Sequence, residues 1–273
     1  MIIMTAVGNP YEAFVREFAE TLDRARALPY GGLAPAARRA PKAGAPRALI
    51  IAPHPDDESI VGALPLRLQR ELGWSVGVVP ATLGSRTERR APRLAELRGA
   101  CAFLGWDVVD VPGSPAKAAD LAKILKAAKP RLVLMPHAED ANATHRRTHR
   151  LVLDALAAAG RDLRCAVAET EFWSTMADPN LLVESSARET ALLVAALSFH
   201  AGEVGRNPYH VLLPCWLADG ARRGAELVGG AGAAATPCRF ATLYRLGRWN
   251  GARLSPRPAR IVAAGADLAF LLD

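Results

Sequence analysis

The chain has 273 residues, of which 51% are hydrophobic and 22% charged, and its formal net charge is +7. This length suits one large α/β domain with a substantial core, and no apolar run approaches the roughly 20 residues of a membrane-spanning helix, so we expect no membrane partner. The arginines are dispersed and no aromatic-rich RNA-binding pattern accompanies them, so we expect no nucleic-acid partner.

The first 46 residues are expected to form a helix and a linker outside the main domain, which we place at residues 47–273. Within residues 10–28, Phe14, Phe18 and Leu22 recur at helical spacing, as in an amphipathic helix that packs outside the core. Residues 30–46 are rich in Pro, Gly, Ala and Arg, which is typical of an extended linker. The sequence leaves open whether the protein is a homo-oligomer in which this linker covers a neighbouring subunit.

The compartment is inferred from the N-terminus and the cysteines. No positive segment followed by an apolar stretch begins the chain, so we expect no secretory signal. The four cysteines are widely scattered and form no CxxC pair, which is typical of free thiols. We therefore expect a cytoplasmic protein.

A short apolar strand, expected at residues 47–51, runs into a polar corner that reads Ala-Pro-His-Pro-Asp-Asp-Glu over residues 52–58. His54 and Asp57 lie three residues apart across this proline-flanked corner, so their side chains can converge on one zinc-type ion. Asp56 lies between them and could act as general base toward a water on the ion. The alternative is that the acids only complement the dipole of a helix expected over residues 59–69.

Further strands and helices alternate along the chain. Strands are expected at residues 74–82, 107–111, 131–137 and 165–174, with helices at 92–104, 116–128, 146–159 and 187–200. This order predicts a Rossmann-like three-layer α/β fold with a mainly parallel sheet in a single domain with an N-terminal helical extension. No GxGxxG follows a strand, so a nicotinamide or flavin cofactor is not expected. From residue 231 onward we expect a loop and, over 261–272, a packing helix.

The corner at residues 52–58 resembles the signature of the LmbE-like deacetylases, the superfamily that also holds the GlcNAc-phosphatidylinositol de-N-acetylases (PIG-L). The resemblance covers roughly residues 47–230. It includes a second strand-loop-helix, in which Ser85 stands where the family has an acid and the matching positions are Thr82, Gly84, Arg93, Glu96 and Leu97.

The resemblance implies a metal site with residues from two loops. His145 aligns with the zinc-binding histidine of the family's second motif, so His54, Asp57 and His145 would hold Zn²⁺, or another divalent ion such as Fe²⁺, with a fourth position open. Asn142 takes the place of that motif's first histidine and is expected to hydrogen-bond the reacting carbonyl. His149, one helical turn beyond His145, is the alternative for this role or for the ligand. Asp140 is expected to orient His145 or the loop.

The function implied by the resemblance is zinc-dependent removal of an N-acetyl group from a GlcNAc-type amino-sugar conjugate, with Asp56 as general base. The partner would be this small-molecule substrate, with contacts expected from Arg86, Glu171 and His200. The alternative is a non-catalytic sugar-binding or regulatory protein on the same scaffold, which would be free to lose Asp56.

Overall fold

The computed structural model describes residues 9–38, 40–111, 113 and 116–271. Within this part of the chain, nine strands form one sheet: β1 (Arg47–Ala52), β2 (Ser75–Pro80), β3 (Asp107–Val108), β4 (Leu132–Pro136), β5 (Cys165–Thr170), β6 (Leu181–Ser185), β7 (Phe240–Trp249), β8 (Leu254–Pro256) and β9 (Arg260–Val262). Their order is β3-β2-β1-β4-β5-β7-β6-β9, with β8 paired to β7. The strands from β3 to β5 are all parallel, which confirms the expected mainly parallel α/β fold.

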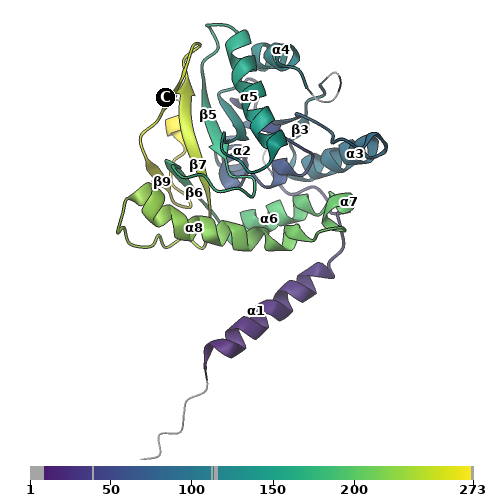
Figure 1. The fold of residues 1–273 in the computed structure, drawn as a ribbon, viewed down its shortest axis with the longest axis vertical. Helices are drawn as coiled ribbons and strands as arrows, with labels where there is room; N and C mark the ends of the chain where they lie inside the picture. The colour runs from purple at the N-terminus through teal and green to yellow at the C-terminus, as the bar shows by residue number, and fades with distance from the viewer. Residues whose placement is uncertain (1–8, 39, 112, 114–115, 272–273) are drawn as a thin grey trace, which may run out of the picture.

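Helices cover both faces of the sheet (Figure 1). One face carries α4 (Ala118–Ala128) and α5 (Ala143–Ala158), and the other carries α2 (Ala63–Leu72), α3 (Thr87–Leu104), α6 (Ala187–Leu197) and α8 (Leu213–Gly229). Side chains of a strand point alternately to its two faces. Accordingly, Leu49 and Ile51 of β1 join the core under α4 and α5, whereas Ile50 joins the opposite core. This is the three-layer arrangement.

The first strand of the chain, β1, lies inside the sheet, and later strands are added on both sides of it. From β1 the chain goes to β2 and β3 on one side, and then returns to β4 and β5 on the other. The carboxyl ends of β1 and β4 lie side by side because the two strands are parallel neighbours. Open α/β sheets bind their ligands at such a switch point.

The polar corner after β1 is more irregular than the expected helix over residues 59–69. A short 3₁₀ helix, η1 (Asp57–Ser59), comes first, and α2 begins only at Ala63. Gly62 separates them with a φ of 80°, and a Cβ at this position would meet the Thr242 side-chain oxygen at 1.8 Å. The close approach of β7 therefore requires glycine here and interrupts the helix.

The C-terminal part differs most from expectation. The loop expected from residue 231 contains β7, which inserts antiparallel between β5 and β6. The packing helix expected over 261–272 is wrong for the described residues: β9 and a short 3₁₀ helix, η3 (Ala269–Leu271), occupy this stretch. Residue 272 lies outside the described part. Two elements before residue 231, β6 and α8, were also not among those expected, whereas for the others boundaries shift: α3 begins at Thr87 and β5 ends at Thr170.

The N-terminal helix expected over residues 10–28 forms as α1 (Tyr11–Arg26) and projects away from the rest of the chain (Figure 1). No residue of α1 is buried. The remaining short helices are α7 (Ala201–Val204) and the 3₁₀ helix η2 (Tyr209–Leu212). Among the described residues, no helix combines the length and the apolar character that crossing a membrane requires.

Candidate metal centre

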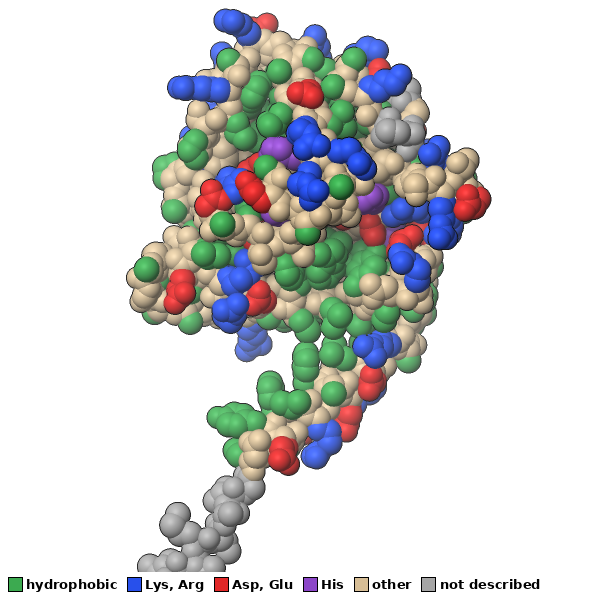
Figure 2. Space-filling model, viewed as in Figure 1, with side chains coloured by type: hydrophobic (Ala, Val, Ile, Leu, Met, Phe, Trp, Pro, Cys, Tyr) green, Lys and Arg blue, Asp and Glu red, His purple; other side chains and the backbone are tan. Residues whose placement is uncertain are grey.

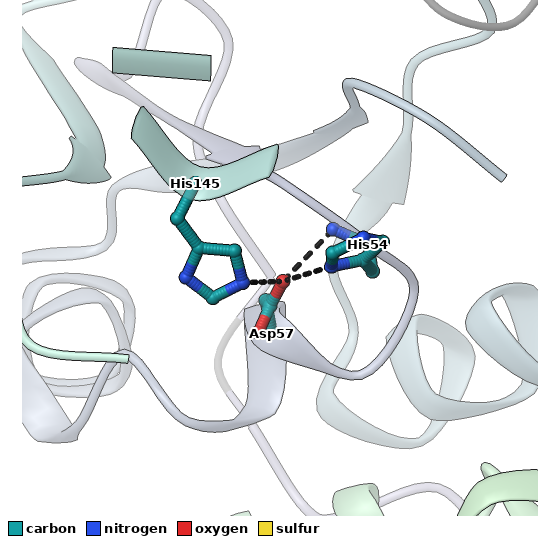
Figure 3. A group of neighbouring side chains, drawn as sticks. All are labelled: His54, Asp57 and His145. Carbon is teal, nitrogen blue, oxygen red and sulfur yellow. Dashed lines mark hydrogen bonds and ion pairs between the residues drawn. The ribbon is translucent and has the colours of Figure 1, made fainter. Parts of the chain in front are cut away.

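Three side chains of metal-ligand type converge where β1 and β4 end (Figure 3). His54 and Asp57 come from the corner after β1, and His145 comes from the first turn of α5. Oδ2 of Asp57 lies 3.3 Å from Nδ1 of His54 and 3.4 Å from Nε2 of His145. One ligand atom from each residue lies within 4.8 Å of the other two. The structure thus brings together two corners that are distant in sequence.

The donor set and its spacing fit a zinc-type ion. Ligand atoms at about 2.0–2.1 Å from a tetrahedral zinc ion lie about 3.3–3.4 Å from one another. The two distances from Asp57 Oδ2 to the imidazole nitrogens are 3.3 Å and 3.4 Å. Two imidazole nitrogens and one carboxylate oxygen are also the mixture that hydrolytic zinc sites use, with a position left for water.

Asp140 orients the imidazole of His145. Its Oδ2 lies 3.0 Å from Nδ1 of His145, so the other ring nitrogen, Nε2, faces Asp57. Oδ1 of Asp140 accepts a hydrogen bond from the backbone N–H of Asn142 at 2.7 Å, which fixes the loop that precedes α5. A carboxylate behind a ligating histidine fixes the ring orientation and raises the basicity of the ligand. The expected place of Asp140 behind His145 agrees with this geometry.

The charges of the cluster reinforce one another. Burial works to raise the pKa of Asp57, but hydrogen bonds from His145 and His54 outweigh it and hold this pKa well below its usual range. Burial works to lower the pKa of His145, but the Asp140 and Asp57 carboxylates raise it to about 10. The site therefore stabilises positive charge between two carboxylates, as a cation site must.

Asp56 lies beside the three ligand-type residues in a strained backbone conformation. Its φ is 114°, which is rare for a residue other than glycine and costs conformational energy. Oδ2 accepts a hydrogen bond from the Tyr209 hydroxyl at 2.5 Å, and Oδ1 lies 3.9 Å from the Arg93 guanidinium. Burial and the nearby Asp57 carboxylate raise the pKa of Asp56 to about 7. Such a carboxyl group can exchange a proton near neutral pH.

The corner that carries Asp56 is fixed by a buried ion pair between His200 and Glu58. His200 is fully buried, and its Nε2 lies 2.7 Å from Oε1 of Glu58. The second oxygen of Glu58 accepts a hydrogen bond from the backbone N–H of Asp56 at 2.9 Å. Burial opposes the charged form of His200, but the Glu58 carboxylate raises its pKa overall. His200, expected as a substrate contact, therefore does not line the cavity and instead holds Glu58 against the corner.

A cavity of about 570 Å³ opens over the cluster, and this volume accommodates a sugar-sized ligand. Its walls come from the two corners, from α3, from the loop after β5 and from the segment that runs from α7 into η2. The lining residues are His54, Asp56, Asp57, Arg93, Asp140, Ala141, Asn142, His145, Phe172, Trp173, Ser174, Glu203, Arg206, Asn207 and Tyr209.

Asn142 and His149 were the two candidates for the residue that polarises the reacting carbonyl, and the structure places only Asn142 of the two at the cavity. Asn142 lines the cavity, and its side-chain oxygen accepts a hydrogen bond from the Thr144 N–H as the N-cap of α5, so its NH₂ group is the part that can serve a ligand. His149 instead points its Nδ1 to the Pro136 carbonyl at 3.0 Å and to Glu169 at 3.2 Å. The structure therefore does not bring His149 to the cluster.

The other two expected substrate contacts also lie outside the cavity wall. Arg86 is exposed at the start of α3, whereas Arg93 from the same helix lines the cavity. Glu171 is buried and is held by the Arg223 guanidinium at 2.6 and 3.0 Å. It also accepts the backbone N–H of Met176, so it shapes the loop that presents Trp173 to the cavity.

Sequence reasoning missed two aromatic residues of the cavity. Tyr209 begins η2, and Trp173 follows β5 in a backbone conformation with a φ of 64°. Their rings pack edge to face with centroids 5.9 Å apart, and Trp173 also packs against Trp216. Trp173 stands two residues after Glu171 in a Glu-x-Trp stretch that resembles the LmbE-like family, so the sequence did carry a signal for it. Tyr209 had no such signal, because its position depends on how distant segments pack.

Residues 49–156 match the family model described as PIG-L, GlcNAc-PI de-N-acetylase. This stretch contains all three ligand-type residues of the cluster, and the match confirms the resemblance to the LmbE-like and PIG-L deacetylases. A comparison with curated proteins finds no match.

Solved structures share the fold at low sequence identity. The conserved protein TT1542 from Thermus thermophilus aligns with a TM-score of 0.56 and 20% identity, over 79% of this chain and 96% of its own. N,N'-diacetylchitobiose deacetylase from Pyrococcus horikoshii aligns with a TM-score of 0.54 and 18% identity, over 89% and 94%. GalB, the 4-carboxy-2-hydroxymuconate hydratase from Pseudomonas putida, aligns with a TM-score of 0.56 and 18% identity, over 74% and 95%.

Proposed function

We propose that this chain, whose residues 49–156 match the PIG-L family, is a metal-dependent hydrolase that removes an N-acetyl group from an N-acetylglucosamine-type conjugate. The observation that carries the proposal is the convergence of His54, Asp57 and His145 beside Asp56 at the floor of one cavity. The fold alone does not choose the reaction, since one structure that shares it is a hydratase and another is a deacetylase of an acetylated sugar.

Zinc is the ion that the donor set fits best, and Fe²⁺ is the alternative. A divalent ion held by His54, Asp57 and His145 would lower the pKa of water to about 7 and polarise a carbonyl group. Asp140 would keep His145 in the tautomer that leaves Nε2 for the ion, because its carboxylate occupies Nδ1.

Asp56 is the general base of the proposed reaction. Its carboxylate lines the cavity, next to the ligand-type Asp57 in the chain, and its pKa is raised to about 7. It would accept a proton from the attacking water and pass this proton to the leaving amine. The Tyr209 hydroxyl and the Arg93 guanidinium hold the two carboxylate oxygens in place.

The remaining cavity residues would bind the acetylated sugar. The NH₂ group of Asn142 can donate a hydrogen bond to the oxygen of the acetyl carbonyl as negative charge develops there. Trp173 offers a flat apolar ring at the cavity wall, while Arg206 and Asn207 supply polar groups for hydroxyls. This mixture of one apolar surface and several polar groups supports a small polar substrate.

The described cysteines support the expected cytoplasmic location. All four are free thiols, and Cys101 and Cys165 are buried. Free thiols persist in reducing compartments, whereas secreted proteins tend to oxidise theirs to disulfides.

The test is amine release from a panel of N-acetylglucosamine conjugates, measured before and after chelation and again after zinc is restored. We expect turnover that chelation abolishes and zinc restores. Asp56→Asn should retain bound zinc and lose about 10²–10⁴-fold in kcat. Sugar binding without turnover in the zinc-loaded wild type would reject the hydrolase and support a sugar-binding protein, whereas near wild-type turnover of Asp56→Asn would reject the assigned base.

A further inference from the structure

Helix α1 has an apolar face that the rest of the described chain leaves exposed. Tyr11, Phe14, Val15 and Phe18 lie along this face, and Tyr11 and Phe14 are 71% and 67% exposed. The helix has 16 residues, none of them buried. Isolated helices of about this length are marginal in water even when they are rich in alanine, and their stability normally comes from packing an apolar face. The sequence of α1 therefore requires a surface to cover it.

An apolar groove of about 600 Å³ lies where α1 joins the rest of the chain, and Ala25 at the end of α1, together with Leu28 and Leu33, lines it on that side. One wall is the outer face of α6, where small side chains recur at helical spacing at Ala187, Ala191, Val194 and Ala195. Small residues allow the backbone of another helix to approach closely. In Figure 2, apolar side chains face each other across the opening between α1 and the underside of the body.

Two buried polar atoms at this groove also lack a partner. Thr190 and His210 line it and are each 3% exposed, and Oγ1 of Thr190 and Nδ1 of His210 have no hydrogen-bond partner among the described residues. The groove and the apolar face of α1 are thus two apolar surfaces of one chain that the described residues leave uncovered.

We propose that two copies of this chain form a dimer by exchanging α1, so that the apolar face of each helix lies in the groove of the other copy. The segment after α1 is anchored beside the groove of its own chain: the ring of Tyr30 packs against His210, and the Gly31 N–H donates to Ser198 Oγ at 3.2 Å. This anchor leaves α1 pointing outward. A second copy covers both the groove and the apolar face of α1, whereas a small ligand in the groove would leave α1 exposed.

The charged residues beside α1 and beside the groove are consistent with a second copy of the chain as the partner. Glu12 and Glu17 flank the apolar face of α1, and neither forms an ion pair with any described residue. Arg188 and Arg239 are exposed next to the groove-lining Ala187 and Phe240, and they too form no ion pair within the described part of the chain. The acids of one copy and the bases of the other are therefore available to pair across the interface.

The same charges argue against a membrane surface as the occupant. Helices that lie on anionic membranes carry mostly Lys and Arg on their polar face. The polar face of α1 instead has more acids than bases: the acids are Glu12, Glu17, Glu20 and Asp23, and the bases are Arg16, Arg24 and Arg26.

The available area is sufficient for a stable dimer. The exposed large apolar side chains between residues 11 and 33 are Tyr11, Phe14, Val15, Phe18, Leu28, Tyr30 and Leu33. Scaled by their exposed fractions of 41–71%, these side chains offer roughly 700 Å² per copy. With the α6 wall of the groove added, each copy reaches the roughly 800 Å² that a standard interface buries per partner.

The first experiment is sedimentation of the full chain over a range of concentrations. We expect a dimer that Phe14→Glu weakens by about 100-fold in Kd, because it places a charge in the apolar contact. Ala13→Glu adds the same charge to the opposite face of α1 and should change Kd less than threefold. Circular dichroism checks that both variants fold. A monomer at all concentrations, a dimer that Phe14→Glu leaves intact, or a chain that co-sediments with phosphatidylserine vesicles as a monomer would overturn the proposal.

The second experiment identifies the groove as the partner surface. In a background with Cys215→Ser and Cys238→Ser, the variants Phe18→Cys and Ala191→Cys are mixed and oxidised. We expect a disulfide-linked dimer that contains one chain of each variant. A dimer cross-linked only through two copies of Phe18→Cys would show that α1 pairs with α1 outside the groove and would contradict the exchange.

Discussion

The Tyr209 hydroxyl donates a hydrogen bond to Asp56 Oδ2 at 2.5 Å, although 153 positions of sequence separate the two residues. It joins η2 to the corner that also carries His54 and Asp57. Because Asp56 has a strained φ of 114°, its carboxylate direction depends on such outside contacts. Tyr209 is therefore a positioning residue for the proposed general base.

Removal of this hydroxyl should impair turnover more than binding. Tyr209→Phe is expected to lower kcat by about 10- to 100-fold with little change in KM, because Asp56 loses the donor that orients it. The measurement is steady-state amine release together with metal content, which should stay at the wild-type level. Tyr30→Phe, which removes a hydroxyl away from the cavity, is the control. Equal kcat values for Tyr209→Phe and wild type would show that Asp56 needs no such support.

The carboxylate behind His145 should control metal affinity. Asp140→Asn is expected to weaken zinc binding by about 10- to 100-fold, because it removes the negative charge that orients and polarises the imidazole. Competition with a zinc-sensitive dye measures this affinity. Asp154→Asn removes an exposed carboxylate from the same helix and should leave the affinity unchanged. If both variants bind zinc as tightly as wild type does, Asp140 does not act on the ligand.

Two adjacent arginines of α8 should differ strongly in their effect on stability. Arg223 pairs with the buried Glu171, whereas Arg222 pairs with Asp219 near the surface. Arg223→Met is expected to lower the free energy of unfolding by about 3–5 kcal/mol, because it leaves a buried carboxylate unpaired. Arg222→Met should change it by less than about 1 kcal/mol. Urea denaturation distinguishes the two; similar losses in both would contradict the buried role of Glu171.

Alkaline pH should destabilise the fold partly through Cys165. Burial raises the pKa of this thiol to about 12, above its value of 9.0 in the unfolded chain. The raised pKa means that this contribution to stability is complete below pH 9 and is lost as pH rises toward 12. Between pH 8 and 10.5 the wild type should lose about 1–2 kcal/mol more than Cys165→Ala does. The control is Cys238→Ala, which removes a half-buried thiol and should lose as much stability as wild type over this pH range.

The sequence was most informative where strand, corner and helix follow one another directly. The apolar run before His54 and the one before the His145 loop fix two parallel strands, and parallel neighbours must present their following loops at one edge. The three ligand-type residues therefore came together as expected. Tyr209 escaped prediction because its place at the site depends on packing between segments far apart in sequence.

The C-terminal strand shows the opposite case. Residues 229–235 consist only of glycine and alanine, and because of this composition the strand β7 that follows was not predicted. Its antiparallel insertion between β5 and β6 depends on pairings 55 to 84 residues apart along the chain. No local period encodes such a pairing. The same insertion explains Gly62, whose lack of a side chain makes room for Thr242.

The most direct test of the account is the zinc stoichiometry of single-residue variants, measured by calorimetric titration of metal-free protein. Wild type should bind one ion per chain, and His54→Ala, Asp57→Ala and His145→Ala should each weaken binding by at least about 100-fold. His149→Ala should bind as wild type does. Unchanged affinity in His145→Ala, or a loss confined to His149→Ala, would contradict the claim that the corners after β1 and β4 hold one ion between them.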